Sequence, residues 1–346
     1  MQLSHRNRSA IAAGALVLAS AALTSAFAQE RPSARCEGLL FSTEEDFVTR
    51  GPEPPDGNPI ISDGDLLVWK MPGGDARLCA RNSELLGPFK TNPQIARDLG
   101  LDAVYSTGGE RPLILFSTEL DDPEGRFTAG DLLTTSAGII PNAALLAQTD
   151  VPPSRGDLGL DAVEIRGEPE RVRRFFRNLN PDALRENPGL LAEMQKRFEI
   201  EILVSVEGTF LSPERRSFLD GDLLSTLSGD VVASNADLLP GLPAGLPMRG
   251  VDFGLDAFTQ GHDPIENVGL DLLSTEISSL RKGTSFTDGD VLQAGPAVFL
   301  KNGVLIHSLE PVVAEVGLDA LHMTPAEDPC GVTEITEIGG IVLSLI

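Results

Sequence analysis

Aromatic rings and basic side chains are scarce in this chain of 346 residues. It has one Trp and one Tyr, Trp69 and Tyr105, beside fifteen Phe. Sugar-binding surfaces usually present flat rings with polar edges, so this scarcity counts against a lectin. Lys and Arg number 27 against 51 Asp and Glu, which gives a formal net charge of −24. Such a charge makes nucleic acid and anionic membranes poor partners and suits cations or basic proteins, but an acidic surface that only aids solubility has the same balance.

The chain also lacks the common catalytic signatures. It has no Gly-x-Ser-x-Gly elbow, no His-Glu-x-x-His zinc pair and no glycine-rich phosphate loop between a strand and a helix. Beyond residue 28 its histidines are His262, His307 and His322, which are too scattered for a His-rich metal site. A non-enzymatic protein is therefore favoured over an enzyme.

Residues 1–28 have the composition of a secretory signal. Arg6 and Arg8 precede a largely apolar run, and Ala26-Phe27-Ala28 places small residues at the cleavage position. We expect the mature chain to begin at Gln29 and to be secreted or periplasmic. An uncleaved membrane anchor is the alternative, although the Ala-rich run is weakly apolar for a span. No later segment is long and apolar enough to cross a bilayer.

The remaining chain contains one pattern four times in the same order. It begins with an apolar run that ends in an acid: Glu44, Glu119, Glu207 and Glu276. A turn follows, Asp-Gly-Asp in three copies and Ala-Gly-Asp in the second, whose last residues are Asp65, Asp131, Asp222 and Asp290. Next comes an asparagine: Asn82, Asn142, Asn235 and Asn302. Each copy ends in Gly-Leu-Asp-Ala, at 100–103, 159–162, 254–257 and 317–320.

Each of the four elements is typical of a short strand. The runs are rich in β-branched and apolar residues and are bounded by Gly, Asp and Asn. The Asp-Gly pairs favour tight hairpins, because glycine readily takes a positive φ. Short strands at regular spacing indicate a sandwich, a barrel or a propeller.

The ends of the chain discriminate among these folds. The first copy lacks a preceding Gly-Leu-Asp-Ala strand, and the last copy has one in excess. If that last strand pairs beside the first copy, the sheets form a ring with no open edge. We therefore predict an all-β fold: a four-bladed β-propeller in a single domain, 29–346, closed by its C-terminal strand. A pair of β-sandwiches built from the same strands remains the alternative.

The cysteines fit this closure. Cys36 lies just before the first copy and Cys330 just after the last strand, so closure predicts a disulfide between them, which an exported protein allows. Cys79 is then left as a buried free thiol or, less favoured, as a partner for another chain.

Four Asp-Ala strands, four blades and a terminal disulfide resemble the hemopexin-type four-bladed propeller. The resemblance covers residues 38–323. It implies the architecture and an ion on the central axis. The chain departs from that family in its longer blades and in lacking aromatic-rich blade strands.

Two segments do not belong to the repeat. Residues 168–199 contain apolar residues at helical spacing and two Asn-Pro pairs that start helices, which predicts two or three short helices as an insert. Packing of this insert on the ring is favoured over a substrate lid. The tail, residues 331–346, is β-prone and is expected to pair with an outer strand.

Two groups of residues are candidates for a site. If the Gly-Leu-Asp-Ala strands face one axis, four carboxylates converge there, and a hard cation such as Ca²⁺ would relieve their repulsion: Asp102, Asp161, Asp256 and Asp319. Hydrogen bonds from each Asp to backbone amides are the structural alternative. The Asp-Gly-Asp turns lack the spacing of an EF-hand and are better explained as hairpin turns.

Three residues after each of these aspartates the copies diverge, to Tyr105, Glu164, Thr259 and His322. Glu164 and His322 are a candidate acid–base pair, with Tyr105 beside them. Unrelated solvent-facing side chains are the alternative.

The sequence leaves two functions open. The first is a secreted acidic binding or scaffolding protein stabilised by calcium, with an unidentified protein or small ligand as partner. The second is a hydrolase or lyase with its site on the axis.

Overall fold

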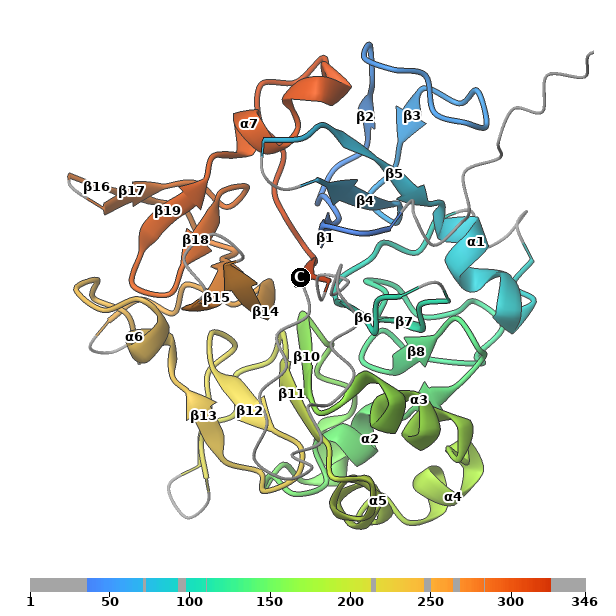
Figure 1. The fold of residues 1–346 in the computed structure, drawn as a ribbon. Helices are drawn as coiled ribbons and strands as arrows, with labels where there is room; N and C mark the ends of the chain where they lie inside the picture. Colours follow the sequence, from blue (N-terminus) through green and yellow to red (C-terminus); the bar gives the residue numbers. More distant parts are fainter. Residues whose placement is uncertain are drawn as a thin grey trace, which may run out of the picture. The chain divides into compact units, whose positions relative to one another are not determined.

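The computed structural model describes residues 36–70, 73–92, 98–109, 111–212, 216–245, 250–263, 268–282 and 284–324. In these ranges the chain is mostly β, with six small antiparallel sheets and a few short helices (Figure 1). None of the helices in these ranges has the length and apolar character needed to cross a membrane. The predicted signal, the tail at 331–346 and Cys330 lie outside the described residues.

Four of the sheets have four strands each. The first sheet contains β20 (Leu321–Met323), β1 (Leu39–Phe41), β4 (Leu66–Trp69) and β5 (Ala76–Ala80). The second contains β6 (Val104–Ser106), β7 (Ile114–Phe116), β8 (Leu132–Thr134) and β9 (Ile139–Ile140). The third contains β10 (Ala162–Arg166), β11 (Glu201–Ser205), β12 (Leu223–Ser225) and β13 (Val231–Ala233). The fourth contains β14 (Ala257–Asp263), β15 (Val268–Ser274), β18 (Val291–Gln293) and β19 (Ala297–Leu300).

The first sheet joins the two ends of the repeat region. β20, from the last Gly-Leu-Asp-Ala copy, pairs antiparallel with β1, so that Leu39 faces Met323 and Phe41 faces Leu321. The amide of Thr324 extends this pairing by donating to the carbonyl of Gly38 at 3.0 Å. The last strand therefore completes the first sheet, as the sequence predicts.

The first strands of the four sheets, β20, β6, β10 and β14, are called the lead strands below. β6 contacts β20 and β10, and β14 contacts β10 and β20. A serine that ends the second strand of each sheet or directly follows it donates its hydroxyl to a leucine carbonyl just before the next lead strand. These bonds run from Ser42 to Leu101 (2.6 Å), Ser117 to Leu160 (2.7 Å), Ser205 to Leu255 (2.8 Å) and Ser274 to Leu318 (3.4 Å). The repeat thus links each sheet to the next in a cyclic order.

The hydrophobic core lies between neighbouring sheets. Leu39 and Phe41 of β1 pack in a cluster with the fourth sheet, whereas Leu40 between them packs with the second sheet. Two further clusters lie between the second and third sheets and between the third and fourth. Because both faces of each sheet are covered, inner strands such as β1, β4 and β7 are continuous apolar runs instead of alternating ones.

The third repeated element forms short helices, not strands as the sequence analysis predicted. Its asparagines begin α1 (Asn82–Leu86), α2 (Asn142–Leu145), α6 (Asn235–Leu238) and α7 (Asn302–Leu305). In the second copy Asp131 Oδ1 accepts the backbone N–H of Asn142 at 2.8 Å, and Asn142 Nδ2 donates to the carbonyls of Gly130 and Gly159. The last acid of each turn therefore fixes the start of a helix.

The turn glycines also differ from expectation. Gly64, Gly130, Gly221 and Gly289 do not have a positive φ. A Cβ at any of them would instead collide with the side-chain amide of the asparagine that follows in the same copy. Close packing, and not hairpin conformation, explains why glycine recurs there.

The remaining elements lie outside the four sheets. β2 (Phe47–Val48) pairs with β3 (Ile60–Ile61), and β16 (Ser279–Arg281) pairs with β17 (Thr284–Phe286). Short 3-10 turns are η2 (Gly87–Phe89), η3 (Pro153–Arg155) and η4 (His307–Leu309).

The predicted insert contains three helices between β10 and β11: α3 (Pro169–Arg177), α4 (Pro181–Glu186) and α5 (Leu190–Phe198). Val172 and Phe175 are fully buried in the cluster between the second and third sheets. The insert therefore packs as part of the core.

The predicted pairing of Cys36 with Cys330 is wrong, and so is the prediction of a free Cys79. Cys36 forms a disulfide with Cys79, with 5.1 Å between their Cα atoms. Cys79 is the extra residue of a β-bulge in β5, between Leu78 and Ala80. This position places Cys79 in the same apolar cluster as Cys36. The disulfide therefore joins β5 to the segment that leads into β1.

Candidate metal centre

The four aspartates predicted to converge lie one or two residues before the lead strands. We call Asp102, Asp161, Asp256 and Asp319 the central aspartates. Asp102, Asp161 and Asp256 expose 8%, 6% and 7% of their surface. The Oδ2 atom of each of the four is buried and has no hydrogen-bond partner among the described residues. The predicted alternative, in which backbone amides satisfy each carboxylate, therefore does not account for these atoms.

The central aspartates influence one another in a cycle. Burial, followed by neighbouring carboxylates, raises the pKa of Asp102, Asp161 and Asp256 well above the ordinary range. For Asp319, burial and then the charges of Asp102, Glu119 and other acids raise the pKa to about 10. The charge of Asp102 also acts on Asp161, and the charges of Asp161 and Asp319 act on Asp256. The four carboxyls therefore lie near enough to raise one another's pKa, and Asp102 and Asp319 are the two that share one group of oxygens with Glu119.

Four glutamates surround the central aspartates, and we call Glu44, Glu119, Glu207 and Glu276 the flanking glutamates. Each packs its carboxylate where a Cβ would stand on the glycine of a Gly-Leu-Asp-Ala segment, as Glu119 does at Gly100. At Gly100 the φ of +71° also favours glycine. Burial, then nearby acids, raises the pKa of Glu44 to about 7. The glycines therefore make room for a second set of acids.

The closest approach is in a group of three carboxyls, Asp102, Glu119 and Asp319, which we call the acidic triad. One oxygen from each lies within 4.8 Å of the others. At 4.8 Å and an effective dielectric constant of about 20, two unit charges repel by about 3.5 kcal/mol. Three ionised pairs would cost about 10 kcal/mol, as much as the entire stability of a typical domain. The triad must therefore bind protons or a cation.

A second acidic group, Asp46, Asp63 and Asp98, lies nearer the surface. Burial, followed by Asp98, raises the pKa of Asp63 to about 7. Asp63 Oδ1 accepts the N–H of Gly64, and Asp46 Oδ1 accepts that of Asp63, so bonds from backbone N–H groups account for part of this group.

The four divergent residues on the lead strands also come together, in a buried polar cluster. Tyr105 and His322 have ring centroids 4.5 Å apart. His322 Nδ1 lies 3.4 Å from Thr259 Oγ1 and 3.6 Å from Glu164 Oε2. Glu164 Oε2 also accepts the N–H of Gln260 at 3.3 Å. The predicted proximity of Glu164 and His322 is therefore present in the structure.

Burial limits what this cluster can do chemically. Tyr105, Glu164, Thr259 and His322 each expose 5% of their surface or less, so they are not the solvent-facing side chains of the alternative hypothesis. His322 Nε2 lies 3.0 Å from the carbonyl of Ser106 on β6, and Thr259 Oγ1 accepts the N–H of Met323 on β20. These contacts cross between lead strands, so the cluster ties neighbouring sheets together.

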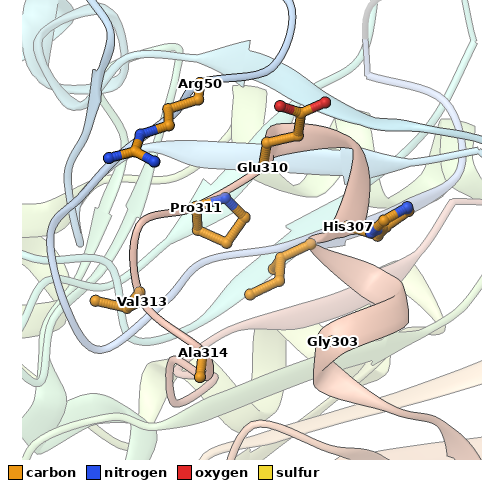
Figure 2. A pocket seen from close by; sticks show the side chains of 8 residues that line it. Arg50, Gly303, His307, Glu310, Pro311, Val313 and Ala314 are labelled. Atoms are coloured by element: carbon orange, nitrogen blue, oxygen red, sulfur yellow. The ribbon is translucent and has the colours of Figure 1, made fainter.

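A pocket at a different place is shown in Figure 2. It is lined by Arg50, Gly303, Ile306, His307, Glu310, Pro311, Val313 and Ala314. The amide of Arg50 donates to the carbonyl of Leu309 at 3.1 Å, so the pocket lies where the segment after β2 meets η4. None of the central aspartates or flanking glutamates lines it, and its single Arg and Glu do not suggest a particular ligand.

No protein-family model, curated protein or solved structure matches this chain. The resemblance to hemopexin-type propellers therefore stays a prediction, and function has to be inferred from the two groups of side chains described above.

The sequence analysis did not select the flanking glutamates as site residues. Their signal was present, because an acid ends the first element of every copy. Their role depends on packing against a glycine from a separate element, as Glu44 does against Gly317, 273 positions away in the chain. Local sequence does not reveal that contact.

Proposed function

We propose that the protein is an exported, acidic binding or scaffolding module with a four-bladed β-propeller fold, in which Ca²⁺ bound by the central aspartates stabilises the meeting of the four sheets. The observation that carries this proposal is the set of four buried Oδ2 atoms that have no hydrogen-bond partner among the described residues. Buried carboxylates are normally paired or coordinate metals. Ca²⁺ takes six to eight oxygen ligands in flexible geometry, which suits a centre of carboxylates from separate elements.

The propeller part of the proposal is supported by the cyclic links among the sheets. Each lead strand contacts two others, and the four serine bonds repeat in the same direction. The pairing of β20 with β1 removes the free edge that the first sheet would otherwise have at that position. An ion among the central aspartates would join all four sheets at once, because each aspartate precedes a different lead strand.

Thermal unfolding in EDTA and in excess CaCl₂ tests the ion. At a concentration one hundred times Kd, a ligand adds about 2.7 kcal/mol of stability, so we expect Ca²⁺ to raise Tm by about 5–10 °C. Asp161→Asn should lose at least half of that increase, because it removes a buried carboxylate of the centre. Asp182→Asn is the matched control, since Asp182 is exposed on α4 and forms only a surface ion pair with Arg185.

Equal Tm values in EDTA and CaCl₂ for the unsubstituted protein would remove the calcium part of the proposal. An equal loss of the Ca²⁺ effect in Asp161→Asn and Asp182→Asn would place the ion somewhere else.

Export is tested separately. Fractionation of the host cells, followed by N-terminal sequencing, should find a chain that begins at Gln29 outside the cytoplasm. A cytoplasmic chain that begins at Met1 would contradict it.

A hydrolase or lyase is the second candidate function. It is favoured by the 3.6 Å between His322 Nδ1 and Glu164 Oε2, with Tyr105 beside them. Turnover in a hydrolase substrate panel that both His322→Ala and Glu164→Ala abolish, while circular dichroism shows a folded protein, would support it. The burial of both side chains favours the first function, because a substrate would need the lead strands to separate.

A further inference from the structure

The acidic triad lies where the last lead strand meets the second sheet. Asp319 lies two residues before β20, the strand that completes the first sheet. Asp102 lies two residues before β6, and Glu119 lies three residues after β7, and both of these strands belong to the second sheet. β20 and β6 are in contact. A cation held by all three carboxyls would therefore bridge β20 and the second sheet.

The oxygens of the triad can bind one ion as they stand. One oxygen from each of its three carboxyls lies within 4.8 Å of the others. Ca²⁺ binds oxygens at about 2.3–2.6 Å, so two ligands of one ion are at most about 5 Å apart. Asp161 and Asp256 belong to no such group among the described residues. The triad is therefore the part of the centre that already has the spacing of a metal site.

Hydrogen bonds within the triad do not satisfy its buried oxygens. Asp102 exposes 8% of its surface, and its Oδ2 atom has no hydrogen-bond partner among the described residues. A proton shared between Glu119 and Asp319, which interact as a hydrogen-bonded pair, would hold those two carboxyls together but leave this atom without a partner. The Oδ2 atom of Asp319 is likewise buried and without a partner in the described part of the chain. A cation in the triad would supply the missing partner for both atoms.

We infer that the proposed Ca²⁺ lies in the acidic triad, with Glu119 as its third carboxylate ligand, and that it fastens β20 to the second sheet. The inference rests on the proposed calcium site and narrows it to one side of the centre. The buried carboxyls of Asp161 and Asp256 then act on the ion through their charge and not as ligands.

The position of β20 gives this site a consequence for the fold. β20 lies at the edge of the first sheet and pairs with β1 only over Leu321–Met323. A strand held by so short a pairing can open locally without unfolding of the whole protein. An ion that binds Asp319 and the second sheet together has to leave before β20 can open. The concentration of free Ca²⁺ would therefore regulate how often the first sheet loses its last strand.

Calorimetric titration of the full chain with Ca²⁺ tests the ligands. Glu119→Gln should weaken Kd by about tenfold or more, because it removes one of three charged ligands. Glu276→Gln is the charge-matched comparison. Glu276 has the same position in the fourth copy and packs against Gly254, but it belongs to no group of three carboxyls among the described residues. Its exposed charge should change Kd by less than about threefold. Glu186→Gln, exposed on α4, should leave Kd unchanged. Circular dichroism of each variant establishes that it is folded.

Amide hydrogen exchange in EDTA and in excess CaCl₂ tests the fastening of β20. Ca²⁺ should slow exchange of residues 321–324 by about tenfold or more, because the bound ion has to dissociate before this segment opens. Exchange of β12, in the third sheet, should slow less and serves as the internal reference. At the same free Ca²⁺, Glu119→Gln should lose most of the effect on residues 321–324, whereas Glu276→Gln should keep it.

The outcomes separate this inference from the function on which it rests. A weaker Kd in Glu119→Gln alone, together with slower exchange confined to β20, supports both. A Kd that weakens equally in Glu119→Gln and Glu276→Gln, or in neither, overturns the placement in the triad and leaves the calcium site intact. Equal slowing in β20 and β12 overturns the fastening of β20. An unsubstituted chain that binds no Ca²⁺ overturns the inference and the calcium site together.

Discussion

Asp319 provides a way to measure how much the buried carboxyls of the metal-free centre lower the free energy of unfolding. Burial, then the charges of neighbouring acids, raises its pKa from the ordinary 3.8 to about 10. Above pH 4 the folded protein therefore keeps a proton that the unfolded chain releases. Each pH unit above the unfolded pKa costs about 1.4 kcal/mol, so the ceiling on this cost is about 2 kcal/mol near pH 5 and about 6 kcal/mol near pH 8.

Asp319→Asn removes this cost, because an amide needs no proton to be neutral. The unfolded chain binds fewer protons than the folded one between about pH 4 and pH 10, so the free energy of unfolding of the parent falls as pH rises through that window. Without metal, the variant should therefore be more stable than the parent, by an amount that grows with pH up to these ceilings. In excess Ca²⁺ the order should reverse, because Asn is a poorer ligand than a carboxylate.

Urea denaturation in EDTA near pH 5 and near pH 8, repeated in CaCl₂, provides the measurement. Asp182→Asn serves as the control for loss of one exposed carboxylate and should differ little from the parent under every condition. The reasoning is refuted if Asp319→Asn is less stable than the parent in EDTA near pH 8, or if the difference between them does not grow with pH.

Two further predictions concern the framework of the centre. The Cys36–Cys79 disulfide closes a loop with a sequence separation of 43, worth about 4 kcal/mol at most, so Cys79→Ser should lower Tm strongly whereas Cys330→Ser should keep the bond, as peptide mapping without reduction would show. Ser205→Ala removes the hydroxyl that donates to the carbonyl of Leu255 and should lower the free energy of unfolding by about 1–2 kcal/mol in urea denaturation; an unchanged value would mean that this bond does not help to join the third and fourth sheets.

Three of the four strands in each sheet, and their order, were predictable because the repeat supplies each of them four times, whereas the outer strands β5, β9, β13 and β19 precede the asparagines and were not assigned. The last strand could be assigned to the first sheet from topology alone, since the first copy lacked a lead strand, and β20 does pair with β1. The same reasoning predicts that Asp102, Asp161, Asp256 and Asp319 converge, and the structure places Asp102 and Asp319 in one group with Glu119. A pattern that repeats fixes equivalent positions even where the local signal is weak.

The helices at the third element were not predictable from the same pattern. Asn142 begins α2 because Asp131 accepts its N–H, and Asn82 begins α1 because Asp65 accepts its N–H at 2.9 Å. The separation between the two partners changes from 17 residues in the first copy to 11 in the second, because the intervening hairpins differ in length. A contact whose spacing varies has no fixed sequence signature.

The disulfide was mispredicted for a related reason. Cys79 faces the cluster around Cys36 only because a bulge inserts one residue in β5. A bulge shifts which residues face each side of a strand, and nothing in the alternation of apolar residues around Cys79 indicated one. Pairing from the ends of the chain, which favoured Cys330, ignored this local geometry.

The repeated acids divide into two classes that sequence alone did not separate. Asp131 and its counterparts recur because both of their oxygens accept backbone N–H groups, which is a complete structural explanation. Asp161 and Asp256 recur equally faithfully, yet each has a buried oxygen with no partner among the described residues. Burial without a partner costs free energy in each of four copies, and the fold gains no bond in return at those atoms. Repetition of an uncompensated cost is best explained by a ligand that compensates it, and the hard cations that carboxylates prefer are the ligands whose charge also relieves the repulsion.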